Sequence, residues 1–171
     1  MKAGVTITRV AATDHTALLE IRRLFEEYAR SLDVDLCFQN FEQELGGLPG
    51  DYQAPDGILL LAYFEGKPAG CCALRRLKAP SHPNTAEMKR LYVRPEFRGK
   101  SIGHELVERV LKFAINNGYV AVALDTLKSM TEARALYARI GFHEIGPYYD
   151  NPNDGTTYMK LELSTTGLPQ K

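Results

Sequence analysis

The sequence lacks the features that mark several large classes of protein. No apolar run among its 171 residues approaches the length that spans a bilayer. Residues 1–6, Met-Lys-Ala-Gly-Val-Thr, carry no extended apolar signal region. Lys plus Arg equals Asp plus Glu, at 21 each, so no net charge attracts the chain to nucleic acid or to an anionic membrane. We therefore expect a cytoplasmic protein with neither nucleic acid nor membrane as a partner.

Cysteine and histidine are also scarce. The three cysteines, Cys37, Cys71 and Cys72, cannot all pair with one another. The adjacent pair stands in a strand-like run, where successive side chains point to opposite faces. We expect all three to be small core residues in a reducing compartment. No Cys/His spacing fits a zinc site, so no metal is predicted.

Two common nucleotide-binding motifs are missing. Gly99-Lys100-Ser101 looks like the end of a Walker A loop, but Arg94 stands where that motif needs its first glycine. No Gly-x-Gly-x-x-Gly occurs, which excludes the usual dinucleotide fingerprint. Gly99-Lys100-Ser101-Ile102-Gly103 does match the letters of the Gly-x-Ser-x-Gly elbow of a hydrolase nucleophile, but no histidine of the chain shows the partner pattern of a catalytic triad, so we do not interpret Ser101 as a nucleophile.

Residues 87–103 are the most informative segment that is present. An apolar strand over 87–93 leads into a basic turn that contains glycine, and the turn opens directly into an amphipathic helix. Such a junction directs several backbone N–H groups and a helix N-terminus at one point, which makes an anion site. Arg98 and Lys100 add positive charge there. The segment therefore predicts a phosphate-bearing ligand between residues 98 and 104.

The remaining pattern predicts one domain over residues 1–171, large enough for a substantial core. Thr13 or Asp14 would cap the first helix, and Glu65-Gly66-Lys67 would form a tight turn between two strands. Predicted strands cover 5–10, 58–64, 69–77, 87–93, 119–126, 142–145 and 157–163, and predicted helices cover 15–31, 39–46, 101–117 and 131–140. Hairpins give antiparallel pairs and the crossover through 101–117 gives a parallel pair. The fold class is thus α/β (α+β), with a mixed, mostly antiparallel sheet flanked by helices on both sides.

Arg98-x-x-Ser101-x-Gly103 resembles the Arg/Gln-x-x-Gly-x-Gly/Ala loop of the GCN5-related N-acetyltransferase (GNAT) superfamily, with serine where the family usually has glycine. The order of elements is similar to the GNAT acyl-CoA N-acyltransferase fold over nearly the whole chain. Residues 129–149 also look like small bacterial acetyltransferases of unassigned substrate. The resemblance implies acetyl-CoA as co-substrate and direct attack by an amine in a ternary complex.

The same resemblance implies where acetyl-CoA lies. Its pyrophosphate would contact the loop residues Arg98, Gly99, Lys100, Ser101, Ile102, Gly103 and His104. Its arm would lie along Leu91, Tyr92 and Val93, and the Val93 N–H would bond the thioester carbonyl. Met130, where many members carry an asparagine, and Ala133 complete the predicted contacts. Read alone, 91–93 is also typical of a plain core strand, and His104 of a solvent-facing helix position.

Two residues are predicted to be catalytic. Tyr137 lies in a segment similar to the family's Ala-x-x-Leu-Tyr-x-x-x-Gly-Phe, where the tyrosine hydroxyl reaches the sulfur of CoA and can donate a proton to it. Glu87 occupies the place of the glutamate that is the general base in histone-acetylating members. The alternatives are a half-buried tyrosine of an amphipathic helix and a surface strand residue near Lys89.

Two predicted loops would bound the acceptor site. Asp35 and Phe38 lie between the first two helices, and Tyr148 and Tyr149 lie in a later loop. Acids with tyrosines suit a small-molecule primary amine of amino-acid-like or polyamine-like character. A non-catalytic acyl-CoA sensor and a protein N-acetyltransferase remain alternatives, although the long loops at 47–57 and 146–156 argue against a protein acceptor. The C-terminal strand could pair across a homodimer.

Overall fold

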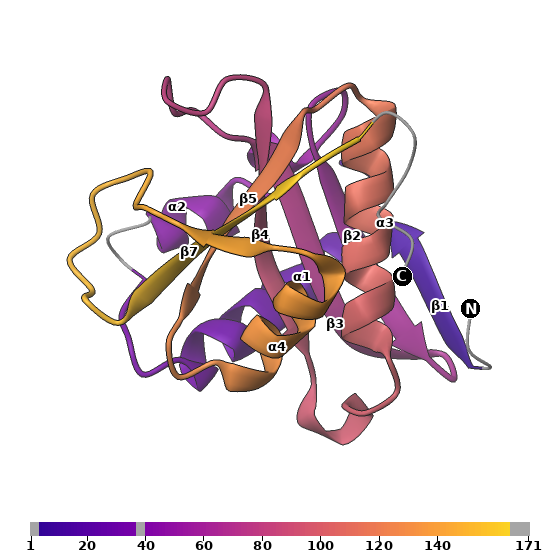
Figure 1. The fold of residues 1–171 in the computed structure, drawn as a ribbon. Helices are drawn as coiled ribbons and strands as arrows, with labels where there is room; N and C mark the ends of the chain where they lie inside the picture. The colour runs from indigo at the N-terminus through magenta and orange to yellow at the C-terminus, as the bar shows by residue number, and fades with distance from the viewer. Residues whose placement is uncertain (1–3, 37–39, 165–171) are drawn as a thin grey trace.

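The computed structural model describes residues 4–36 and 40–164, which form a seven-stranded sheet with helices on both faces (Figure 1). The strand order is β1-β2-β3-β4-β5-β7-β6. The strands are β1 (Val5–Arg9), β2 (Ile58–Phe64), β3 (Lys67–Arg76), β4 (Thr85–Val93), β5 (Ala121–Leu127), β6 (His143–Ile145) and β7 (Thr156–Glu162). All neighbouring strands are antiparallel except β4 and β5, which are parallel. The predicted mixed sheet is confirmed.

The helices follow the predicted order closely. They are α1 (His15–Ser31), α2 (Phe41–Gly46), α3 (Ile102–Asn116) and α4 (Thr131–Ile140), with short 3-10 turns η2 (Gly50–Tyr52) and η3 (Pro95–Phe97) that the sequence did not predict. The Asp14 side chain accepts a hydrogen bond from the Ala17 N–H at 3.0 Å, which satisfies a donor of the first turn of α1. Asp14 is therefore the cap, as one of the two predicted candidates. No described helix has both the length and the apolar character needed to cross a membrane.

Each face of the sheet has its own hydrophobic core. The face covered by α3 and α4, here the α3/α4 face, buries Leu106, Val110 and Cys72. The opposite face, here the α1/α2 face, buries Phe25 and Cys71. In Figure 1, α3 lies in front of the strands. The two neighbouring cysteines thus point to opposite faces, as predicted, and both are buried free thiols. Cys37 lies outside the described residues.

The β2–β3 hairpin shows how local sequence sets the register. Glu65 and Gly66 both have positive φ, at 48° and 78°, which is the backbone of a tight turn with two left-handed residues. Phe64 consequently pairs with Lys67. The predicted turn is confirmed, and it brings the apolar residues of both strands into the cores.

Candidate active site

The parallel strands β4 and β5 separate soon after they begin to pair. Their pairing runs from Thr85 opposite Ala121 to Glu87 opposite Ala123, and it extends no further among the described residues. Residues 88–93 of β4 therefore lack a strand partner on the β5 side. Unpaired backbone groups at such a gap need another partner, and an extended ligand rich in amides can supply one.

A cleft of about 1180 Å³ opens at this gap, between the end of β4, the start of α3 and α4. We call it the main cleft. Most of the predicted cofactor residues line it, namely Leu91, Tyr92, Val93, Arg98, Gly99, Ser101, Ile102, Gly103, His104, Met130 and Ala133. The fold thus brings the strand-to-helix junction and α4 together around one space.

The turn into α3 exposes a row of backbone donors. Gly99 and Ser101 have φ values of 75° and 64°, in the left-handed region. A Cβ at Gly99 would meet nothing within 4 Å, so conformation and not space favours glycine there. The Glu105 N–H bonds the Ser101 carbonyl at 3.0 Å, and the N–H groups of residues 102–104 precede this bond. These donors have no intrahelical acceptor, and with the positive end of the helix dipole they fit a diphosphate.

The two predicted cations of this turn behave differently. Arg98 lines the main cleft, and its Nε donates to the Val93 carbonyl at 3.1 Å. The Lys100 ammonium instead lies 4.6 Å from the ring centroid of Phe64 on β2 and does not line the cleft. Phe64 in turn packs against Phe97 at 5.9 Å. The structure therefore brings Arg98, and not Lys100, to the cleft wall.

A second cavity, of about 40 Å³, lies in the gap between β4 and β5. We call it the narrow cavity. Its wall includes Lys89, Leu91, Asp125, Thr126, Met130, Tyr137, Asn151 and Asn153, together with parts of the α1–α2 region. Because Tyr28, Leu32, Leu91 and Met130 line both spaces, the narrow cavity adjoins the main cleft.

Tyr137 projects from α4 into the wall of the narrow cavity. The residue is 6% exposed, and its ring packs against Phe142 with centroids 5.7 Å apart. Burial raises the pKa of Tyr137 well above its usual value. The hydroxyl therefore stays protonated at neutral pH and remains a hydrogen-bond donor beside the gap.

A β-bulge in β4 places charge on one face of the sheet. Arg90 has a φ of 60°, and the register against β3 shifts so that Arg90 and Leu91 together lie opposite Cys72. The bulge therefore shifts by one residue the alternation of β4 side chains between the two faces of the sheet. Arg90 and Lys89 both reach partners on the α1/α2 face, whereas Leu91 packs into the core of the α3/α4 face.

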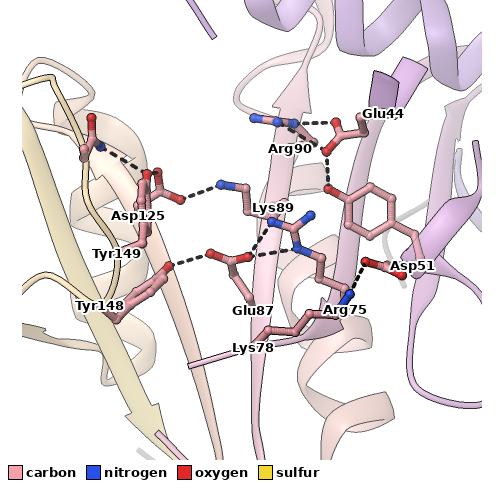
Figure 2. Close-up of polar contacts among 12 residues, drawn as sticks. Glu44, Asp51, Arg75, Lys78, Glu87, Lys89, Arg90, Asp125, Tyr148 and Tyr149 are labelled. Carbon is pink, nitrogen blue, oxygen red and sulfur yellow. Dashed lines mark hydrogen bonds and ion pairs between the residues drawn. The ribbon is translucent and has the colours of Figure 1, made fainter. Parts of the chain in front are cut away.

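Glu87, the predicted general base, is held by two partners (Figure 2). Its Oε1 pairs with the Arg75 Nη2 at 2.9 Å, and its Oε2 accepts a hydrogen bond from the Tyr148 hydroxyl at 2.9 Å. The residue is 3% exposed and lines neither cavity. The structure thus places the predicted catalytic residue Glu87 in contact with the predicted acceptor residue Tyr148. Neither residue lines the main cleft or the narrow cavity.

A second buried pair reaches the narrow cavity itself. The Lys89 Nζ lies 2.9 Å from Asp125 Oδ1, and the Tyr149 hydroxyl donates to Asp125 Oδ2 at 2.6 Å (Figure 2). Burial alone would raise the pKa of Asp125, but Lys89 and the Tyr149 hydroxyl outweigh it and hold that pKa below its usual value. Tyr149 therefore contributes to the site through Asp125.

A third buried pair connects α2 to β4. Glu44 lies 2.8 Å from the Arg90 Nε and also accepts a hydrogen bond from the Tyr52 hydroxyl at 2.7 Å. The Arg90 guanidinium stacks 5.3 Å from the ring centroid of Phe41. These contacts anchor the short helix α2 over the charged part of β4.

The predicted residues between α1 and α2 are less informative. Asp35 is exposed and lines neither cavity, although its neighbours Val34 and Leu36 line the narrow cavity. Phe38 lies outside the described residues. The prediction that these side chains bind the acceptor stays a prediction.

Sequence reasoning missed several lining residues. Tyr28 of α1 and Leu32, which directly follows that helix, line both cavities, and Arg139 of α4 lines the main cleft. Burial raises the pKa of Tyr28 to about 12. The signal of Tyr28 was present but ambiguous, because an aromatic residue on the apolar face of a helix also fits an ordinary core. Within residues 4–36 and 40–164, no group of three or more His, Cys, Asp or Glu side chains could hold a metal.

Comparison with known proteins decides the family. The model of the acetyltransferase (GNAT) family matches residues 18–142. The chain belongs to the GNAT family. An uncharacterized N-acetyltransferase of Schizosaccharomyces pombe is 40% identical over 146 residues, covering 85% of this chain and 88% of that protein. The N-acetylaspartate synthetase of Danio rerio is 30% identical over 136 residues, covering 79% of this chain but only 47% of that protein.

The structural comparison agrees. An N-acetyltransferase from Thermoplasma acidophilum, solved in complex with coenzyme A, has a TM-score of 0.66 at 18% identity, covering 95% of this chain and 100% of that one. The GNAT acyl-CoA N-acyltransferase fold predicted from the sequence is confirmed. The protein is therefore an acetyl-CoA-dependent acetyltransferase.

Proposed function

We propose that this GNAT enzyme acetylates the primary amine of a small molecule of amino-acid-like or polyamine-like character, by direct attack in a ternary complex. One observation carries the proposal: the narrow cavity adjoins the main cleft through the gap between β4 and β5. An amine arriving from the α1/α2 face can therefore meet an acyl group held on the other side. The similarity to N-acetylaspartate synthetases supports an amino-acid-like acceptor.

The main cleft would hold acetyl-CoA, which supplies the activated acetyl group. The first N–H groups of α3 and the Arg98 guanidinium would hold the diphosphate, because they combine donors with positive charge. The unpaired backbone of Leu91 and Val93 would pair with amides of the arm, and the Val93 N–H would stabilise charge that develops on the thioester carbonyl oxygen.

The chemistry needs proton transfers at two atoms. The acceptor ammonium must lose one proton before its nitrogen can attack, and we assign this step to Glu87, acting through water and positioned by Arg75 and Tyr148. The new N–C bond forms, the C–S bond breaks, and the nitrogen releases a second proton. The sulfur leaves as a thiolate and takes up a proton, with the Tyr137 hydroxyl as donor. The net products are the amide, the CoA thiol and one proton.

A panel of amines tests the proposal. Amino acids, polyamines and short peptides are each mixed with enzyme and acetyl-CoA, and thiol release is followed with a thiol-reactive dye. We expect release with at least one small-molecule amine. Release with peptides alone would contradict a small-molecule acceptor. No release with any amine, while calorimetry shows that acetyl-CoA binds, would contradict the proposed function as a whole.

A further inference from the structure

The narrow cavity contains a buried ion pair of the kind that contributes little to stability. The side chains of Lys89 and Asp125 are 4% and 11% exposed, and both line the cavity. Removing two charges from water costs roughly what their attraction returns, so such a pair is weak support for folding. Its position in the wall beside Tyr137 instead makes both signs of charge available to a molecule that enters.

Asn153, a residue of the same wall, carries a buried hydrogen-bond donor without a partner among the described residues. The Asn153 Oδ1 accepts the Gly155 N–H at 2.9 Å, which fixes the orientation of the amide. Its Nδ2 is buried and has no hydrogen-bond partner among the described residues. A buried donor left unpaired is costly, so a ligand that offers an acceptor at this point gains by satisfying it.

The size of the narrow cavity limits what can enter. About 40 Å³ admits only a few groups the size of a water molecule, given that one such group needs roughly 10–15 Å³ on the same kind of measure. The polar head of a small molecule fits this space. The enzyme therefore reads the immediate surroundings of the acceptor nitrogen.

From these contacts we infer that the acceptor is a free α-amino acid, whose ammonium faces Asp125 and whose α-carboxylate faces Lys89 and the Asn153 amide. An α-amino acid carries its two charges on one carbon, and so presents them at the spacing of an ion pair. The amino acid would lie antiparallel to the Lys89–Asp125 pair. Its ammonium would then face the Asp125 carboxylate, and its carboxylate would face the Lys89 ammonium. Asn151, which donates to the Tyr149 hydroxyl at 3.1 Å, helps to keep Asp125 in place.

This inference rests on the proposed function and narrows its acceptor to one chemical class. It makes the α-carboxylate a group that the enzyme recognises, and neither an amine lacking it nor a peptide N-terminus carries one on the same carbon as the amine. The carboxylate recognised here is the one on the carbon that bears the amine.

The test compares acids with their amides. The proteinogenic L-α-amino acids are each assayed beside the corresponding α-carboxamide, which keeps the amine and removes the negative charge. We expect the wild-type enzyme to prefer the best acid over its amide by about tenfold or more in kcat/KM, the usual effect of a hydrogen bond to a charged group. Equal use of acid and amide would overturn the inference while leaving the proposed function intact.

Asn153→Asp isolates the unpaired donor. The substitution keeps the oxygen that accepts the Gly155 N–H and replaces the orphan amide with a carboxylate oxygen, which repels an incoming carboxylate. We expect KM for the acid to rise by about tenfold, with a change of less than about threefold for the amide. An equal rise for both acceptors would overturn the assignment of Asn153.

Lys89→Gln removes the cation, and Lys78→Gln is its matched control because Lys78 forms an exposed pair with Asp51 outside both cavities. We expect Lys89→Gln to abolish most of the preference for the acid and Lys78→Gln to leave it unchanged. Thermal denaturation shows whether Lys89→Gln is folded. If it is not, Asn153→Asp and the comparison of acid with amide in the wild type still decide the question.

Discussion

The two faces of the sheet at the β4–β5 gap are built from different groups. The α3/α4 face contributes backbone N–H groups, apolar side chains and Arg98 to the main cleft, and the unionised Tyr137 to the narrow cavity. The α1/α2 face carries three ion pairs with largely buried carboxylates, Arg75–Glu87, Lys89–Asp125 and Arg90–Glu44, and tyrosines donate to these carboxylates. Lys89, Asp125 and Arg90 line the narrow cavity, whereas Arg75 and Glu87 line neither cavity. The groups of both faces meet at β4, where the bulge at Arg90 changes which side chains point to which face of the sheet.

With acetyl-CoA on the α3/α4 face and the acceptor on the α1/α2 face, as proposed, this difference explains how a shared co-substrate and a particular acceptor are encoded. Backbone donors are available to any sequence that adopts the turn, so a short local pattern suffices to bind a diphosphate. Ion pairs need side chains from distant segments, as with Glu44 and Arg90, which are 46 residues apart. The acceptor side can therefore change between family members without altering the side that holds the co-substrate.

Tyr137→Phe should give the largest effect, because it removes the hydroxyl that we propose as the proton donor to the sulfur. We expect kcat to fall by about a hundredfold, with acetyl-CoA affinity by calorimetry nearly unchanged. Since the pKa of Tyr137 lies well above its usual value, wild-type kcat should not decline from loss of this proton between neutral pH and pH 10.

Tyr119→Phe is the matched control for this change. Its hydroxyl donates to the Asp56 carbonyl at 2.7 Å, far from the cavities, so the variant should lose some stability and keep its kcat. A wild-type kcat in Tyr137→Phe would contradict the proposal that the Tyr137 hydroxyl donates a proton to the sulfur.

Glu87→Gln tests whether the paired charges of the α1/α2 face take part in chemistry. We expect kcat to fall by about twentyfold, below the usual effect of a general base because both Glu87 oxygens already accept hydrogen bonds. Tyr148→Phe removes one of these bonds but keeps the carboxylate, and should lower kcat by less than about threefold. Equal losses in the two variants, or a fall in melting temperature without a fall in kcat, would indicate a structural role for Glu87.

Arg98→Ala and Lys100→Ala compare two cations from one turn. Arg98 lines the main cleft, so its loss should raise KM for acetyl-CoA by about tenfold. Lys100 lies over Phe64, so its loss should change that KM by less than about twofold. Equal effects would mean that Lys100 turns into the cleft when acetyl-CoA binds.

Local patterns explain why the α3/α4 face could be predicted. The Glu65-Gly66 turn and the junction over residues 98–104 each depend on neighbouring residues, and the structure contains both. The resemblance around Tyr137 likewise lies within one helix and the residues after it.

The α1/α2 face could not be predicted in the same way. Nothing near Lys89 in the sequence indicates that it meets Asp125, and nothing near Tyr148 indicates that it meets Glu87, because these contacts span 36 and 61 residues. The bulge adds a further obstacle, since simple alternation would place Lys89 and Arg90 on opposite faces. Tyr148 and Tyr149 were predicted with Asp35 as acceptor residues, and Glu87 separately as the general base, but their partners in the structure depend on the tertiary fold.

Ser101→Gly should give the smallest effect and tests the backbone argument most directly. A residue with a side chain is strained at a φ of 64°, so glycine should raise the free energy of unfolding by about 0.5–1 kcal/mol, measured by denaturant titration. Ser129→Gly, in a loop where φ is not positive, should lower it by a similar amount. Because glycine keeps the backbone N–H, affinity for acetyl-CoA should stay the same in Ser101→Gly. Lower stability in Ser101→Gly would instead mean that the serine side chain holds the turn, and that this side of the gap also depends on side-chain contacts.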